Sequence, residues 1–416
     1  MQPDAGAPHT PHRPWRVPMI ARDPAQRGRA STPLEAFFDL CFVVAVAQAA
    51  AQLHTQLAAG EIAHAVGGYL LVFFGIWWAW MNFTWFASAY DTDDVPYRLL
   101  TLVQIAGALV FAAGVAPAME SGSFAVATVG YVIMRVAMVT QWLRAAAGHV
   151  EGRPAAARYA IGVGAVQVGW LLRLLVPGIS GIVAFVLLAL CEMAVPVWAE
   201  SRGRETSWNA GHVSERYGLF TIIVLGESVA GATGGVQSAI SARGVSASVI
   251  VLALAGLVLV FGVWWTYFKH DAAEGLKSAS AETHLRTALT WGYGHFGIFA
   301  AIAALGAGLE LAFATSGEGR VAGVTAALAI AIPGAIYLVL LPVVHARLAR
   351  GRSLPPLYNV LAAVLLLLVA LAASLITLPF SVAGMAVVVA LLLAGHLAAA
   401  ERPPAPVSEE RPAGRL

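Results

Sequence analysis

Apolar runs of roughly 20 residues recur along this chain from about residue 34 to residue 399, and they constrain its fold more than any other feature. A helix of that length matches the thickness of a bilayer. Hydrophobic residues make up 59% of the chain and charged residues only 12%, against about 25% charged residues in ordinary soluble domains. Because a helix satisfies its own backbone hydrogen bonds in lipid, the sequence predicts an all-α, polytopic transmembrane helical bundle.

The spacing of the runs predicts about twelve spans joined by short links. Their expected ranges are 34–58, 65–89, 97–118, 123–147, 155–176, 179–199, 212–235, 245–268, 286–312, 321–345, 356–377 and 380–399. They divide into a first six-helix half, 34–200, and a second, 211–400. Residues 1–33 lack the apolar stretch of a cleavable signal peptide, and we expect them, like residues 401–416, to form a disordered tail.

Basic residues lie unevenly about these spans. When the spans alternate in direction, nearly all Lys and Arg residues outside them fall on the side of the N-terminus, and only Arg243 and Arg320 fall on the other. Cytoplasmic loops carry an excess of Lys and Arg, so both termini are predicted to be cytoplasmic. The formal net charge of +2, with no single basic patch, predicts no nucleic-acid partner. The expected partner is the lipid bilayer, and the sequence leaves a homo-oligomer open.

Two apolar segments resemble each other across half the chain. Phe73–Trp80, FFGIWWAW, matches Val260–Tyr267, VFGVWWTY, and the spans before them align more weakly, with Glu35 opposite Glu215. Six spans in each repeat would give the halves the same orientation, about an axis along the membrane normal. The sequence thus predicts two parallel six-helix repeats, although tryptophan-rich apolar helices also look alike by chance.

The seventh span carries ionisable residues, which are costly inside a membrane. His212, Glu215 and Arg216 lie at its start and Glu227 lies well inside it. Helical periodicity places His212, Arg216 and Glu227 on one face and Glu215 to one side. We interpret this face as lining the bundle interior, with Glu227 as a binding site for a proton, a cation or a small solute. The alternative is that Glu227 pairs structurally with a buried arginine.

The first span also has polar residues on two faces. Glu35 and Asp39 lie four residues apart near its start, where they would bind ions or simply favour the helix N-terminus. Three glutamines spaced four residues apart, Gln48, Gln52 and Gln56, lie on roughly the opposite face. A helix with polar groups on both faces contacts protein or water on both, so we expect it to be central to its half.

Two further groups of charged residues are candidates for a role. The loop after the second span is acidic on an otherwise basic side, and we expect it to dock on basic loops, with a divalent cation site as the alternative; its residues are Asp91, Asp93, Asp94 and Arg98. Charges inside other spans are candidate buried partners: Arg135, Arg173 and Glu192.

Common enzyme signatures are absent from the sequence. It contains no HExxH, Walker A or GxSxG motif, and the GxGxxG at Gly292–Gly297 lies inside a long apolar run with no strand before it. Cys41 and Cys191 both lie in apolar runs, which does not indicate a metal site or a disulfide. We therefore expect no enzyme activity, no cofactor and no metal.

Three ordered motifs resemble the bacterial low temperature requirement protein A (LtrA) family. They are LEAFFDLCFVVAVAQ from Leu34, WFASAYDTDDVPYR from Trp85 and HVSERYGLFTIIVLGES from His212, within a similarity covering residues 30 to about 400. The resemblance implies a polytopic protein of the bacterial plasma membrane, named for a growth phenotype in the cold. It implies no substrate or catalytic residue.

A fainter similarity links EAFFDLCFVVAVA to the Phe-Ser-Asp motif in the first helix of potassium channels built from six-span repeats. It would place Phe38 and Asp39 at the cytoplasmic mouth of a pore flanked by the first and seventh spans, but the second half lacks the aspartate. The leading hypothesis is a solute or ion transport protein. The alternatives are a non-transport membrane protein, either a scaffold or a lipid-acting enzyme, and a cation channel.

Overall fold

The computed structural model describes residues 15–201, 206–269, 272–277, 284–316, 320–346 and 354–401. These residues form α-helices, one short 3-10 helix and loops, and no strand. Most of the two predicted tails, residues 1–14 and 402–416, and the loop arginines Arg202 and Arg204 lie outside the described residues.

The first group of helices comprises α1 (Pro33–Ala58), α2 (Ile62–Tyr90), α3 (Val95–Ala113), α4 (Val115–Ser121), α5 (Ala125–Gly148), α6 (Arg153–Arg173) and α7 (Gly178–Glu200). The second comprises α8 (Ala210–Arg243), α9 (Ala247–Phe268), α10 (Ala272–Lys277), α11 (His284–Thr315), α12 (Arg320–His345), α13 (Pro356–Leu371), η1 (Ala372–Ser374) and α14 (Leu378–Ala400). Within the described residues, twelve helical segments are long and apolar enough to cross a membrane, which confirms the predicted fold class.

One span is longer than predicted. Helix α8 continues through Gly234 and Gly235 to Arg243, and it ends at Gly244, which adopts a φ of 74°. A positive φ of this kind strains most residues but not glycine. Glycine is therefore favoured at the position that ends the helix. The glycine pair inside α8 does not interrupt the helix.

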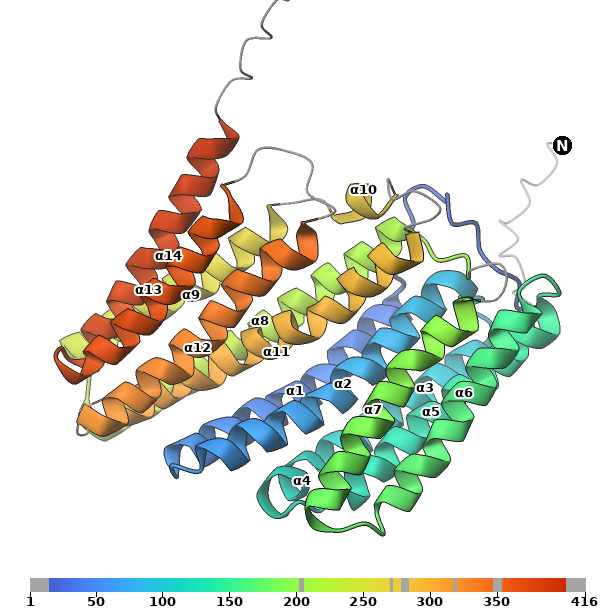
Figure 1. Cartoon of the computed structure of the whole chain (residues 1–416), viewed down its shortest axis with the longest axis horizontal. Helices are drawn as coiled ribbons and strands as arrows, with labels where there is room; N and C mark the ends of the chain where they lie inside the picture. The colour runs from blue at the N-terminus through green and yellow to red at the C-terminus, as the bar shows by residue number, and fades with distance from the viewer. Residues whose placement is uncertain are drawn as a thin grey trace, which may run out of the picture.

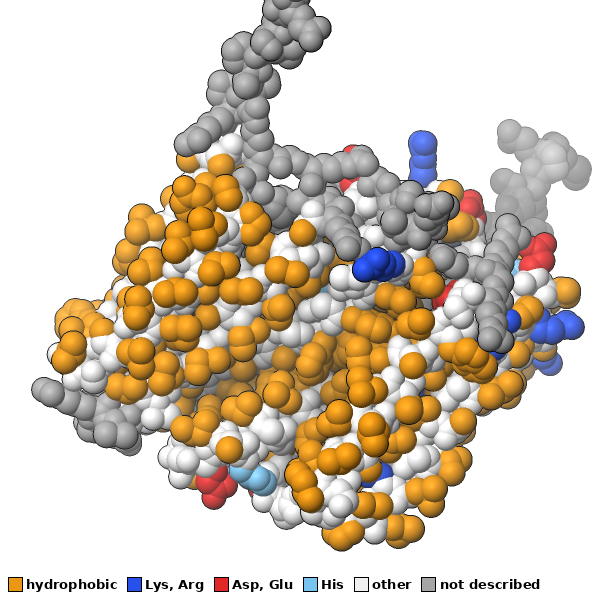
Figure 2. Space-filling view, viewed as in Figure 1, with side chains coloured by type: hydrophobic (Ala, Val, Ile, Leu, Met, Phe, Trp, Pro, Cys, Tyr) orange, Lys and Arg blue, Asp and Glu red, His pale blue; other side chains and the backbone are white. Residues whose placement is uncertain are grey.

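The surface of the bundle is apolar along its flank. Figure 2 shows hydrophobic side chains over most of the visible flank, with charged side chains gathered toward its ends. Large aliphatic side chains remain exposed in the middle of helices, among them Val136, Val186 and Leu190. A soluble monomer rarely exposes such extensive apolar area, so these flanks indicate contact with lipid.

The two groups of helices lie side by side and meet at the centre of the molecule (Figure 1). Helix α1 contacts both α8 and α11 across the boundary, and α2 contacts the same two helices. We call the end where α1 and α8 begin the basic end, because Arg22, Arg98 and Arg144 bind the aspartates of the α2–α3 loop there, and the other end the opposite end. The relation of the two groups as repeats stays a prediction.

Candidate functional site

The N-termini of α1 and α8 form a matched pair at the basic end. Thr32 caps α1 in a capping box with Glu35: the Glu35 N–H donates to the Thr32 hydroxyl, and the Glu35 carboxylate accepts from the Thr32 N–H at 2.8 Å. Asn209 caps α8 by accepting from the His212 N–H at 2.9 Å. Each helix therefore begins one turn before its first ionisable residue in the membrane-spanning segment.

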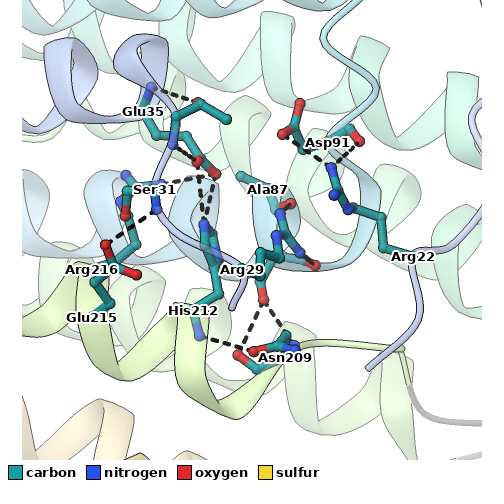
Figure 3. Close-up of polar contacts among 12 residues, drawn as sticks. Arg22, Arg29, Ser31, Glu35, Ala87, Asp91, Asn209, His212, Glu215 and Arg216 are labelled. Carbon is teal, nitrogen blue, oxygen red and sulfur yellow. Dashed lines mark hydrogen bonds and ion pairs between the residues drawn. The ribbon is translucent and has the colours of Figure 1, made fainter. Parts of the chain in front are cut away.

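Two acidic residues of α1 pair with two basic residues of α8, both at a separation of 177 in sequence. Glu35 lies 3.1 Å from Nε2 of His212. Asp39 accepts two hydrogen bonds from Arg216, from Nε at 2.8 Å and from a terminal nitrogen at 2.5 Å. The other terminal nitrogen of Arg216 lies 3.3 Å from Glu35, so the four residues form one network, which we call the α1–α8 charge network (Figure 3 labels Glu35, His212 and Arg216).

This network is sealed from water. All four side chains are fully buried. Trp80 of α2 donates its indole N–H to Asp39 at 2.7 Å, and its ring stacks on Phe220 at 4.2 Å. A buried charge is tolerated when its partner is buried with it, whereas removal of one partner leaves an uncompensated ion. The two groups of helices are therefore held together, and closed, at the basic end.

The chain before α1 adds a second layer over this end. Arg29 donates to the backbone carbonyls of Ala87, at 2.7 Å, and Ser88, where α2 ends. A cation at a helix C-terminus satisfies carbonyls that have no partner within the helix. Asn209 donates to the carbonyls of Pro24 and Gln26, both at 2.9 Å. Figure 3 shows this segment crossing between α2 and the start of α8. Residues 15–32 thus contact the bundle, although they belong to the predicted disordered tail.

Glu215 and the acidic loop belong to the same layer. Glu215 is exposed and accepts from the backbone N–H of Ser31 at 3.2 Å. Asp91 contacts Arg22 at 3.4 Å, and Asp93 binds Arg98 at 2.8 Å. Burial raises the pKa of Asp91 to about 6, with the charge of Glu35 adding to the shift and Arg22 opposing it.

Asp94 has the most partners of the three loop aspartates. It caps α3 by accepting from Tyr97 N–H, and it also binds Arg144 at 2.7 Å and the N–H of Val17 at 2.9 Å. Burial alone would raise the pKa of Asp94, but these donors outweigh it and leave the pKa below its usual value. In the structure the loop contacts basic side chains and backbone donors. Within the described residues, no three His, Cys, Asp or Glu side chains gather as a metal site.

Glu227 lies apart from the α1–α8 charge network, more than ten residues further along α8 toward the opposite end. It is half-buried, and among the described residues it has no hydrogen-bond or ion-pair partner. Its charged neighbour is Glu310 of α11, whose carboxylate repels it. One turn after Glu227, the missing side chain of Gly231 makes room for Glu310: a Cβ there would lie 3.4 Å from the Glu310 carboxylate. His54 of α1 lies 3.9 Å from Glu310 on the other side.

The arginines suggested as structural partners of Glu227 lie elsewhere. Arg135 lies inside the first group of helices, 3.8 Å from Glu192 and 2.6 Å from the hydroxyl of Tyr131. Glu192 is a buried hub that also accepts from Trp78, Gln167 and Trp170. Arg173 lies near the end of α6.

Gln48 is exposed, whereas Gln56 is buried and donates to the carbonyl of Met119.

A pocket between the two groups of helices lies near the basic end. Its walls are rich in aromatic side chains, and the space within it is about 50 Å³, enough for a few water molecules. Trp85 and Trp208 meet edge to face at 4.8 Å, and Trp142 stacks on Tyr159 at 4.1 Å. Glu200 adds a carboxylate that accepts from the Tyr159 hydroxyl at 2.8 Å.

Sequence reasoning missed several members of these sites. Trp80, noted in the sequence only as part of the internal repeat, donates to Asp39, and Arg29, which belongs to the predicted tail, is buried. A signal for the α1–α8 charge network is present: two acids four residues apart in one span, and His212 and Arg216 four residues apart in the other. The proximity of Glu310 to Glu227 has no such signal, because it depends on how α11 packs on α8.

Comparisons with known proteins agree with this architecture. A family model described as "Bacterial low temperature requirement A protein (LtrA)" matches residues 30–394. A curated protein of Rhizobium meliloti (strain 1021), "Uncharacterized protein RA0937", is 28% identical over 283 residues, which cover 65% of each chain. The chain thus spans just under two thirds of that relative. No solved structure matches the chain.

Proposed function

Because this chain belongs to the bacterial low temperature requirement A family, whose model covers most of it, and carries twelve candidate membrane spans, we propose that it is a transport protein of the bacterial plasma membrane. A solute or ion would move along the boundary between the two groups of helices. The basic end is the cytoplasmic side in this proposal, because positive residues are retained inside.

The observation that carries the proposal is the pair of neighbouring carboxylates Glu227 and Glu310, of which Glu310 has His54 at 3.9 Å and Glu227 has no basic partner among the described residues. Both belong to membrane-spanning helices, and neither has an arginine or lysine partner among the described residues. Two carboxylates close together favour retention of one proton or capture of a cation. A purely structural role would instead match each acid with a base, as the α1–α8 charge network does. Ionisable residues inside a membrane commonly mark ion or proton pathways.

The remaining features fit a carrier that is closed at its cytoplasmic end. The α1–α8 charge network joins the two groups of helices there, and the carboxylate pair lies along the same boundary toward the opposite end. Occupation of the pair by a proton or cation removes its repulsion and so changes the packing of α8 against α11, which already touch beside Glu227 through Ser228 and Ile302. The opposite step separates Asp39 from Arg216 and opens the pocket between the groups to the cytoplasm.

Flux into proteoliposomes, with and without a pH gradient, tests the proposal across a panel of cations and small solutes. We expect a gradient-dependent flux in the wild type that Glu227→Gln and Glu310→Gln each lower at least about tenfold, as for a lost proton-transfer group. Glu215→Gln is the matched control, because Glu215 lies on the same helix but is exposed at the basic end. Equal flux through the wild type and Glu227→Gln would remove the main support.

A non-transport scaffold is the second candidate, and the α1–α8 charge network favours it. A fully paired and buried network can serve solely to join two helix groups. In that case Glu227 would matter for stability, and Glu227→Gln would lower the thermal unfolding temperature in detergent without changing any flux. A cation channel lined by α1 and α8 is a third candidate, and single-channel currents in planar bilayers would distinguish it from a carrier.

A further inference from the structure

His54 lies on α1 toward the opposite end of the molecule, about 22 Å along the helix from Asp39. Both contacts of the α1–α8 charge network join residues that are 177 apart in sequence. The same separation matches His54 with Gly231 of α8. Because α1 and α8 both begin at the basic end and run in the same direction, the register set by the network places His54 level with Gly231.

The Glu310 carboxylate of α11 occupies the space between these two positions. Its Oε1 lies 3.9 Å from Nδ1 of His54, and a Cβ on Gly231 would lie 3.4 Å from its Oε2. Glu227, whose charge Glu310 repels, lies one turn before Gly231 on α8. Three ionisable residues from three helices, His54, Glu227 and Glu310, therefore gather at the boundary between the two groups of helices, and we call them the boundary cluster.

One nitrogen of His54 has no partner. Nδ1 faces Glu310, whereas Nε2 is buried and makes no hydrogen bond with any described residue. Buried polar atoms are nearly always hydrogen-bonded, so an orphaned one calls for a functional explanation or a water molecule. Imidazole gains and loses a proton near neutral pH and can pass it from one ring nitrogen side to the other. His54 thus has one nitrogen beside a carboxylate and a second nitrogen able to receive a proton.

The surrounding helices supply no competing charge at this level. On α9 and α12, residues 247–266 and 322–336 include no ionisable side chain. Toward the opposite end, the other titratable side chains described on α2, α4, α8 and the link before α2 are Glu61, His64, Tyr69, Glu120 and Arg243. Glu61, His64 and Glu120 are exposed, Tyr69 donates to a carbonyl of α11, and Arg243 donates to two oxygens at the end of α11. Among the described residues, none of the five forms an ion pair with the boundary cluster.

The ligand set of the boundary cluster suits a proton better than a metal cation. Ca²⁺ takes six to eight oxygen ligands and Mg²⁺ a near-ideal octahedron, and the cluster offers two carboxylates and an imidazole. The hydroxyl of Ser228, beside Glu227, is directed to the carbonyls of Val224 and Ile302. Imidazole suits Zn²⁺, Cu²⁺ or Ni²⁺, but within the described residues no three His, Cys, Asp or Glu side chains lie close enough to hold a metal ion.

We propose that the boundary cluster is a proton relay entered from the opposite end through His54, and that the proton is the coupling ion of the transport. This inference rests on the proposed function and names its ion. The imidazolium of His54 releases the proton at Nδ1, and Oε1 of Glu310 accepts it through a bridging water, since the two atoms are 3.9 Å apart. Glu310 passes the proton to the Glu227 carboxylate and becomes an anion again. Neutral His54 then takes the next proton from water.

Time-resolved infrared spectroscopy of the full chain in nanodiscs tests the relay after a laser-induced pH drop, from about pH 8 to about pH 5, the range in which histidine titrates. The carboxylic C=O band of protonated Glu227 is isolated by subtracting the response of Glu227→Gln. The subtraction also removes Asp91, whose pKa of about 6 gives it a band in the same range. We expect the same band in choline, sodium and potassium chloride. Loss of the band in sodium or potassium at the same pH would overturn the proposal, because a metal cation would then occupy the site.

Two variants test the route of the proton. His54→Gln and Glu310→Gln should each slow the appearance of the Glu227 band at least about tenfold, as for a lost proton-transfer group. His64→Gln is the matched control, because His64 is exposed at the same end of the molecule, and it should leave the rate unchanged. A rate in His54→Gln equal to that of the wild type would overturn the relay, as expected if His54 and Glu310 formed only a structural ion pair.

The inference and the proposed function fail in different ways. The cation series uses the wild type and Glu227→Gln alone, so a folding defect in His54→Gln does not remove the test. Flux that a sodium or potassium gradient drives and a pH gradient does not would keep the proposed transport and overturn the proton as its ion. Protonation of Glu227 that depends on His54, without flux of any cation or solute in the panel, would support the relay and remove the transport.

Discussion

The energetic role of the α1–α8 charge network can be measured with a double-mutant cycle on Asp39 and Arg216. Arg216 makes two hydrogen bonds to Asp39 and contacts Glu35, all with fully buried side chains. Arg216→Gln leaves two buried carboxylates with His212 as their remaining basic partner, and Asp39→Asn leaves the guanidinium with Glu35 alone. Breaking a buried pair from one side costs about 3–5 kcal/mol.

The double variant, Asp39→Asn with Arg216→Gln, replaces both charges by neutral amides. Removal of a buried pair as a whole is often close to neutral, so we expect its cost to be no greater than that of either single variant. If each single change costs about 3–5 kcal/mol and the double change costs about the same, the coupling energy is about 3–5 kcal/mol. A coupling of this size would show that the network acts as one unit.

Unfolding by sodium dodecyl sulfate in mixed micelles, followed by circular dichroism, would measure these free energies. Arg98→Gln is the control, because Arg98 and Asp93 form an ion pair at 2.8 Å with half-exposed Arg98 and about one third of Asp93 exposed. An exposed pair contributes about 0–1 kcal/mol. Additive effects of the two buried substitutions, or a loss in Arg216→Gln no larger than that in Arg98→Gln, would refute the reasoning.

Two further predictions concern the acidic loop and the packing of α11. The folded-state pKa of Asp91 is raised from 3.8 to about 6, so its contribution to stability is present below about pH 4 and is lost as the pH rises through 6. Asp91→Asn should therefore gain stability relative to the wild type, on the order of 2–3 kcal/mol between pH 4 and pH 7; a pH-independent difference between the two unfolding curves would contradict this. Gly308→Ala should lower the unfolding temperature, because a Cβ there would lie 2.3 Å from the carbonyl oxygen of Ala329 on α12. Gly234→Ala is its control, since that position faces open space in a helix, and equal losses in both variants would rule out the clash as the cause.

The sequence by itself determined which segments cross the membrane and where several helices begin. Apolar runs of sufficient length specify spans, because a helix is the structure that satisfies the backbone in lipid within one segment. Helix starts are equally local: Thr32 and Glu35 are three residues apart, and their capping box involves no other part of the chain. The docking of Asp91, Asp93 and Asp94 was also suggested by an acidic loop on a basic side. Hydropathy, however, placed the end of α8 too early, because it does not distinguish a glycine within a helix from one that ends it.

Only the tertiary structure decided which charges meet. Alignment of the first span with the seventh, as internal repeats, placed Glu35 opposite Glu215. The folded chain instead places Glu35 against His212 and Asp39 against Arg216. The matching four-residue spacing of the two acids and the two bases is compatible with this register, but which pairs form depends on how α1 and α8 pack against Trp80 and its neighbours. The same holds for Glu227 and Arg173. Their positions on helices were predictable, but the lack of a basic partner for Glu227 and of an acidic partner for Arg173 among the described residues depends on which helices surround them. Pairing is a property of the packed bundle, because it joins side chains far apart in the chain, 177 residues for Asp39 and Arg216.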